Sequence, residues 1–151
     1  MEFTGLHFCS NRGVTVITLG SFAVEIKHSR EVYASASQLE FNERNDCAVR
    51  AYATASCIDY ARALELFAKH GRKAKHGTFL SVTESVVRTE FPNVFAIGYP
   101  DRPSLASWVS KHTEGHYMVF TAGHAFAVVD GVVHDWKPGE RRRVQWTMKL
   151  V

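Results

Sequence analysis

The segment "HYMVFTAGHAFAVVDGVVHDW", residues 116–136, constrains the fold more than any other part of the chain. It is rich in β-branched and aromatic residues, as strands are, and is interrupted at Ala122-Gly123 and Asp130-Gly131. An Asp-Gly pair between apolar runs is a strong signal for a two-residue hairpin turn. The segment therefore predicts consecutive antiparallel strands, and "RRRVQWTMKLV", residues 141–151, predicts a closing strand.

Helical patterns precede this sheet. From Cys47 onward the residues are small and apolar on most sides, which predicts a buried helix. A second helix is expected from Asp59 to His70, with Asp59 as N-cap and Gly71 as the stop. Two shorter helices are expected near residues 82–90 and 103–111, the latter with Pro103 as its first residue.

Helices followed by a compact antiparallel sheet indicate an α+β fold. At 151 residues the chain suits a single domain, 1–151, with a catalytic core over 42–137. Residues 1–40 are expected to form an N-terminal β-hairpin extension, because "VTVITLGSFAVEIKH" reads as two strands around a Gly20-Ser21 turn.

Composition narrows the class of protein. With 46% hydrophobic and 22% charged residues the chain is typical of globular proteins, and it has no long apolar run or signal sequence. A cytoplasmic protein without a membrane partner is therefore expected. A formal charge of +3 is too small to indicate nucleic-acid binding, and the basic clusters at 69–76 and 140–143 are interpreted as solvated loops.

Cysteine is the first candidate for chemistry. The spacing of Cys9, Cys47 and Cys57 matches neither a zinc site nor a disulfide framework, so reduced thiols are expected. Cys47 follows Asn45 and Asp46, either of which can cap the helix, and a helix N-terminus favours the thiolate. The alternative is that Cys47 is a small packed hydrophobe. Cys57, between two helices, is interpreted as structural.

A nucleophilic thiol needs a base, and the base needs a group that orients its ring. If Asp130-Gly131 is a two-residue turn, Val129 pairs with Val132, and His124 and Asp135 lie diagonally on one face. The hairpin therefore predicts a His–Asp pair. Asp130 is assigned to the turn itself.

The other histidines are interpreted as surface or packed residues. A zinc site from His112, His116, His124 and Asp135 is conceivable on paper, but Gly115 interrupts any helix that would join the first two. No metal or cofactor is therefore expected.

A cysteine at a helix N-terminus, followed by His and Asp on successive strands, resembles the papain-like cysteine peptidase superfamily, which includes the C39-like and NlpC/P60 peptidases. The matching stretches are "NDCAVRA" at 45–51, "GHAFAVVDG" at 123–131 and "HDW" at 134–136. With "GRKAKHGT" after the second helix, they look most like a family of small, largely uncharacterised bacteriophage proteins. The resemblance implies a papain-like fold with Cys47 as nucleophile, His124 as base and Asp135 as the orienting residue.

The oxyanion site departs from that family's pattern. Papain-like peptidases usually carry a glutamine a few residues before the cysteine, but Phe41 stands six residues before Cys47. Asn42, Gln38 and Asn45 are the candidate replacements, with Asn42 preferred because it precedes the helix by about one turn.

The leading hypothesis is a cysteine hydrolase that cleaves an amide or isopeptide bond in a protein or peptide, as a bacteriophage protein acting on a host protein in the host cytoplasm. One alternative is an inactive papain-like scaffold that binds a host protein through the basic loop 69–76 and through Trp108, Trp136 and Trp146. Others are a transglutaminase-like acyl transferase and a peptidoglycan amidase or endopeptidase. The sequence carries no signal for oligomeric state.

Overall fold

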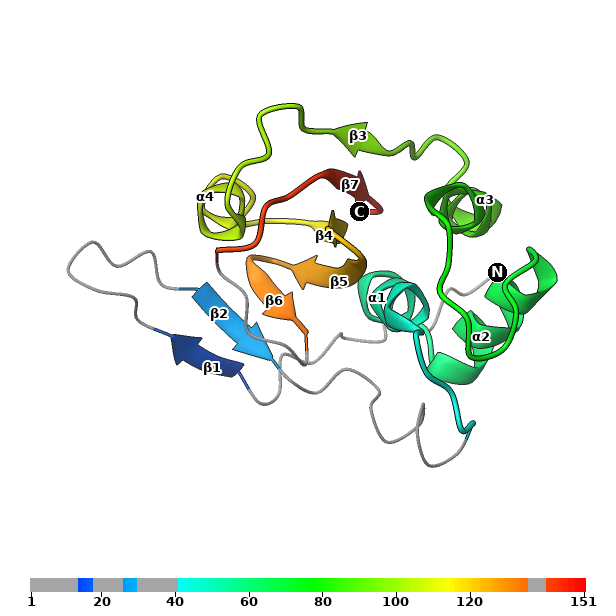
Figure 1. Cartoon of the computed structure of the whole chain (residues 1–151). Helices are drawn as coiled ribbons and strands as arrows, with labels where there is room; N and C mark the ends of the chain where they lie inside the picture. Colours follow the sequence, from blue (N-terminus) through cyan, green and yellow to red (C-terminus); the bar gives the residue numbers. More distant parts are fainter. Residues whose placement is uncertain (1–13, 18–25, 30–40, 136–140) are drawn as a thin grey trace, which may run out of the picture.

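The computed structural model describes residues 14–17, 26–29, 41–135 and 141–151. Their strands form one sheet in the order β1-β2-β6-β5-β4-β7-β3, with four helices packed around it (Figure 1). The predicted α+β class is therefore confirmed. None of the described helices is long and apolar enough to cross a membrane.

Five antiparallel strands make up the main part of the sheet. The strands β4 (His116–Thr121), β5 (His124–Val129) and β6 (Val132–His134) follow one another through two tight turns, as predicted. The closing strand, β7 (Trp146–Lys149), pairs with β4. A two-residue strand that the sequence did not predict, β3 (Ile97–Gly98), pairs with the free edge of β7.

The β5–β6 turn has the predicted geometry. Asp130 and Gly131 both have positive φ, 48° and 77°, as a type I′ turn requires, and Val129 pairs with Val132. The carboxylate of Asp130 also accepts a hydrogen bond from the N–H of Gly115 at 2.9 Å. The assignment of Asp130 to the turn is therefore confirmed.

The two faces of the sheet carry different helices. Helix α1 (Cys47–Ser56) lies between the sheet and α2 (Tyr60–Lys69), and α3 (Leu80–Glu90) packs beside α2 (Figure 1). Their apolar residues meet one set of strand residues, Met118, Ala125, Ala127 and Met148. The short helix α4 (Leu105–Ser110) packs with the alternate set, Val119, Phe126, Val128 and Val133. The period of two along each strand thus builds both cores.

Helix ends follow the predictions in part. Asp59 is the N-cap of α2, its side chain accepting from the N–H of Arg62, and Gly71 follows the helix with φ 100°. The prediction that Pro103 begins the fourth helix is wrong, because Ser104 caps α4 through the N–H of Ser107. An N-cap hydroxyl satisfies a helix N–H that proline only removes.

The predicted N-terminal strands join the main sheet. Strands β1 (Val14–Ile17) and β2 (Ile26–Ser29) are antiparallel, and β2 pairs in parallel with β6. Ile17 pairs with Ile26, two residues beyond the Val24 that a two-residue turn at Gly20-Ser21 would place opposite it. The two antiparallel strands are confirmed, and the Gly20-Ser21 turn between them lies outside the described residues.

Replacing Asp59 tests the start of α2. Asp59→Ala removes the acceptor of the Arg62 N–H, so the free energy of unfolding in urea should fall by about 1 kcal/mol. Asp59→Asn keeps a capping oxygen and should retain most of that stability. Equal losses in the two variants would contradict a capping role.

Candidate functional site

Cys47 is the first residue of α1, and its side chain is half-buried with a free thiol. Asp46 occupies the N-cap position but makes no capping hydrogen bond. Its buried carboxylate instead accepts from the hydroxyl of Tyr60 at 2.7 Å and from the guanidinium of Arg50 at 3.2 Å. Asn45 likewise donates elsewhere, to the carbonyl of Lys75. The prediction that Asn45 or Asp46 caps the helix is therefore wrong for both side chains.

The surroundings of Cys47 favour the thiolate. Burial raises the pKa of the thiol, but a hydrogen bond with His124 and two backbone N–H groups, those of Ala125 and Ala48, act in the opposite direction. The net effect is a pKa below the usual value of 9.0. The thiol therefore lies where the start of β5 meets the start of α1, and both elements provide donors to the sulfur.

His124 links this thiol to a buried carboxylate. It is the first residue of β5, and its Nε2 lies 3.0 Å from Oδ1 and 2.9 Å from Oδ2 of Asp135, directly after β6. Because Nε2 faces Asp135, Nδ1 is the nitrogen left for Cys47. The predicted His124–Asp135 pair, on the face that also carries Phe126, is confirmed as a contact.

The charge balance around His124 favours its protonated form. Burial lowers the pKa of the imidazole, but hydrogen bonds and charge from Asp135 and Cys47 raise it by more. The net shift is upward from 6.5, opposite in direction to that of Cys47. A thiolate beside an imidazolium is the arrangement these two shifts stabilise together.

Arg142 is a partner of Asp135 that the sequence reasoning missed. Its Nη1 donates to Oδ2 at 2.8 Å, and Asp135 is 1% exposed. The two contacts hold this buried carboxylate in position. One of the three arginines in "RRR" before β7 thus contacts a buried carboxylate, so the interpretation of this cluster as a solvated loop is wrong for Arg142.

An open groove of about 1230 Å³ runs past Cys47 and His124. Asn45 lines it, with its amide committed to Lys75; Asn42 is exposed and is not among the lining residues, and Gln38 lies outside the described residues. Gln145, just before β7, also lines the groove and is not among the oxyanion candidates expected from the sequence. Among the described residues, Asn45 and Gln145 are the two whose side-chain amides line the groove.

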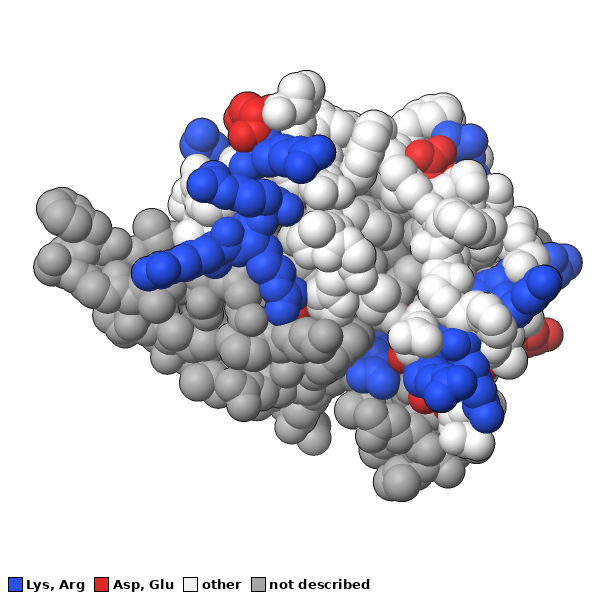
Figure 2. Space-filling view, in the orientation of Figure 1, with Lys and Arg blue, Asp and Glu red and all other residues white. Residues whose placement is uncertain are grey.

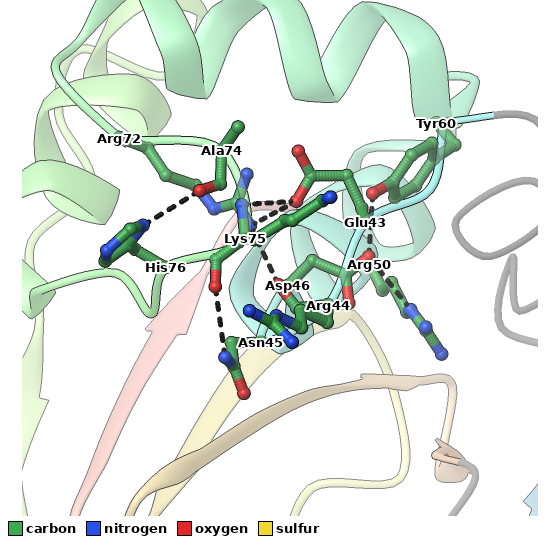
Figure 3. A network of polar contacts seen from close by, with 10 residues as sticks. All are labelled: Glu43, Arg44, Asn45, Asp46, Arg50, Tyr60, Arg72, Ala74, Lys75 and His76. Carbon is green, nitrogen blue, oxygen red and sulfur yellow. Dashed lines mark hydrogen bonds and ion pairs between the residues drawn. The ribbon is translucent and has the colours of Figure 1, made fainter.

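Two loops that form one side of the groove are tied together by Glu43 (Figure 3). Its carboxylate accepts from the guanidinium of Arg72 at 3.0 Å and from the N–H of Lys75 at 2.9 Å. Both side chains of the Glu43–Arg72 ion pair are buried. This contact holds the segment before α1 against the segment after α2, and residues of both segments line the groove.

Two further predictions concern the other candidate side chains. Cys57 is disulfide-bonded, so the expectation of reduced thiols is wrong for this residue; Cys9 lies outside the described residues.

Trp108 is buried, with its indole N–H donating to the hydroxyl of Tyr99 at 3.0 Å, so it is not a surface aromatic. Within the described ranges, no group of three or more His, Cys, Asp and Glu side chains is placed to hold a metal ion.

Comparison with protein-family models, with curated proteins and with solved structures finds no match to the chain.

The reactivity of Cys47 should depend on pH in a specific way. Because its pKa lies below 9.0 and the thiolate is the nucleophile, alkylation by iodoacetamide should have its midpoint below that pH. His124→Ala removes the largest contribution that lowers the pKa of Cys47 against the effect of burial, so the midpoint should move to higher pH. Stopped-flow alkylation with mass spectrometry of the labelled residue measures both. A midpoint at or above 9.0 in the unmodified chain would contradict the assignment.

Glu43→Gln tests the contact between the loops. Burial raises the pKa of Glu43, but Arg72 and the Lys75 N–H lower it by more, so ionised Glu43 stabilises the fold above its ordinary value of 4.5. That contribution is lost as pH falls through the lowered pKa. At neutral pH the variant should lose about 3 kcal/mol of unfolding free energy, because Arg72 stays buried without its partner.

The loss should shrink as the pH of the urea titration falls below 4.5. Glu84→Gln breaks the more exposed ion pair with Arg88 and should cost no more than about 0.5 kcal/mol. Similar costs for Glu43→Gln and Glu84→Gln would show that the buried pair does not hold the loops.

Proposed function

We propose that the protein is a cysteine hydrolase of papain-like fold that cleaves an amide or isopeptide bond in a protein or peptide. The observation that carries the proposal is the position of His124, which contacts Cys47 on one side and Asp135 on the other. A nucleophile, a base and a group that orients the base are the three parts this chemistry requires. Their convergence from α1, β5 and the end of β6 is difficult to explain by packing alone.

The proposed reaction has two steps. The Cys47 thiolate attacks the substrate carbonyl, and the tetrahedral oxyanion collapses as His124 gives its proton to the leaving amine. Water, deprotonated by the same imidazole, then attacks the thioester and releases the carboxylic acid and the thiol. Asp135 keeps its carboxylate on Nε2 throughout, so that Nδ1 remains directed at the reacting sulfur.

The oxyanion needs donors near the sulfur. In the proposed mechanism the uncapped start of α1 supplies backbone N–H groups, and Gln145 supplies the side-chain amide. Gln145 takes the place of the glutamine that papain-like peptidases carry before their cysteine. This assignment replaces Asn45, whose amide is bound to Lys75, and Asn42, which does not line the groove.

Gln145→Ala tests this assignment. Loss of one oxyanion donor should lower kcat by about 10²-fold and leave KM nearly unchanged, because the interaction forms only in the transition state. Asn42→Ala is the matched control and should leave kcat unchanged. The opposite ranking of the two variants would return the role to Asn42.

Hydrolysis itself is tested with a degenerate peptide mixture, whose products are identified by mass spectrometry. The chain should produce new termini, Cys47→Ala should produce none, and His124→Ala should be slower by about 10²- to 10⁴-fold. An added primary amine that appears in the products would identify an acyl transferase instead. Identical product profiles for the chain and for Cys47→Ala would contradict any covalent chemistry at Cys47.

Resemblance to bacteriophage proteins supports a host protein as the substrate, and a cytoplasmic location remains a prediction. The disulfide at Cys57 weighs against a reducing compartment, because structural disulfides are rare there. In the alternative, an inactive scaffold that binds a host protein, Trp108 cannot be part of the binding surface, because it is buried.

A further inference from the structure

The charged side chains that line the groove are unevenly balanced. Four are basic and two are acidic, and both acidic ones, Glu43 and Asp46, are in ion pairs with Arg72 and Arg50. The other two basic residues, Arg44 and Lys73, are exposed and form no ion pair with the described residues. The groove therefore offers positive charge that no protein carboxylate within the described chain neutralises.

A second group of basic residues lies outside the groove lining, near the start of α4. Figure 2 shows Lys and Arg side chains gathered on two sides of a largely uncharged surface. On the side near α4 the exposed arginines are Arg102, Arg141 and Arg143, with Arg143 donating to the carbonyl of Arg102 at 3.5 Å. Residues 141–143 lead directly into Gln145 and Trp146, which line the groove. Asp101 is an exposed carboxylate in the same loop as Arg102.

Aromatic side chains form part of the groove wall. Phe79 is 81% exposed and Trp146 is 42% exposed, and both line the groove. Trp146 lies close against Gly98, where an added Cβ would come within 2.8 Å of the indole ring. Large exposed aromatic side chains beside a reactive site are typical of surfaces that bind another molecule.

We propose that this groove binds an extended polypeptide segment that carries several acidic side chains and one bulky apolar side chain. The apolar residue packs between Phe79 and Trp146, and the acidic residues contact Arg44 and Lys73 on one side and the arginines near α4 on the other. The proposal rests on the proposed function and names its substrate class. Basic and aromatic residues together also suit single-stranded nucleic acid, but a nucleic acid offers no acyl carbon to a thiolate.

Binding can be measured without catalysis. The full chain with Cys47→Ala is titrated into two fluorescent peptides of equal length, one with four glutamates around a central phenylalanine and one with glutamines in their place. The acidic peptide should bind about tenfold more tightly at about 0.05 M salt, and the advantage should shrink at about 0.3 M salt.

Charge reversal locates the surface. Arg44→Glu with Lys73→Glu should weaken binding of the acidic peptide about tenfold and leave the glutamine peptide unaffected. Lys149→Glu is the control, because Lys149 is exposed and pairs with Tyr117 at the opposite end of β4 from the groove. Thermal unfolding of each variant establishes that it remains folded.

Equal affinities for the two peptides, or equal effects of the groove and control variants, would overturn the proposal. Tighter binding of a single-stranded oligonucleotide than of the acidic peptide would assign the surface to nucleic acid instead. Failure of the proposed function is separate: it would appear as ordinary reactivity of Cys47 and absent hydrolysis, with selective binding of the acidic peptide retained.

Discussion

The two-residue turn at Asp130-Gly131 is the constraint on which the candidate site depends. Side chains alternate along a strand, so one extra residue in this turn would move Asp135 to the other face of the sheet. The positive φ angles of Asp130 and Gly131 match the twist of the hairpin and fix the pairing of Val129 with Val132. A local backbone preference thereby sets the contact between His124 and Asp135, which are eleven residues apart.

Charges around the site reinforce one another. Asp135 is buried and accepts from both His124 and Arg142, and its hydrogen bond and charge raise the pKa of the imidazole. The imidazole in turn lowers the pKa of Cys47 against the effect of burial.

Local sequence signals predicted the elements that position the site, but they did not predict the long-range contacts. Parity along the β5–β6 hairpin placed His124 beside Asp135, and the small residues after Cys47 indicated the buried helix. Arg142 could not be assigned, because its contact depends on how the segment before β7 crosses the end of β6. Gln145 could not be assigned for the same reason, since the pairing of β7 with β4 brings it to the groove.

The sequence also did not predict the roles of the side chains at the start of α1. Asp46 stands at the N-cap position of α1, yet its carboxylate is bound by Tyr60, fourteen residues further along the chain, and by Arg50. Capping propensity is a local preference, and here a buried ion pair and hydrogen bond override it. As a result the first turn of α1 has no side-chain cap, and its backbone N–H groups are the ones assigned to the proposed oxyanion site.

The central claim is that His124 is held between Cys47 and Asp135 as a protonatable base. A ¹⁵N NMR titration of its imidazole in the unmodified chain, in Cys47→Ala and in Asp135→Asn tests this most directly. The pKa of His124 should lie above 6.5 in the unmodified chain and fall in both variants, since each removes a contact that raises it. An unshifted pKa that neither substitution changes would contradict the account.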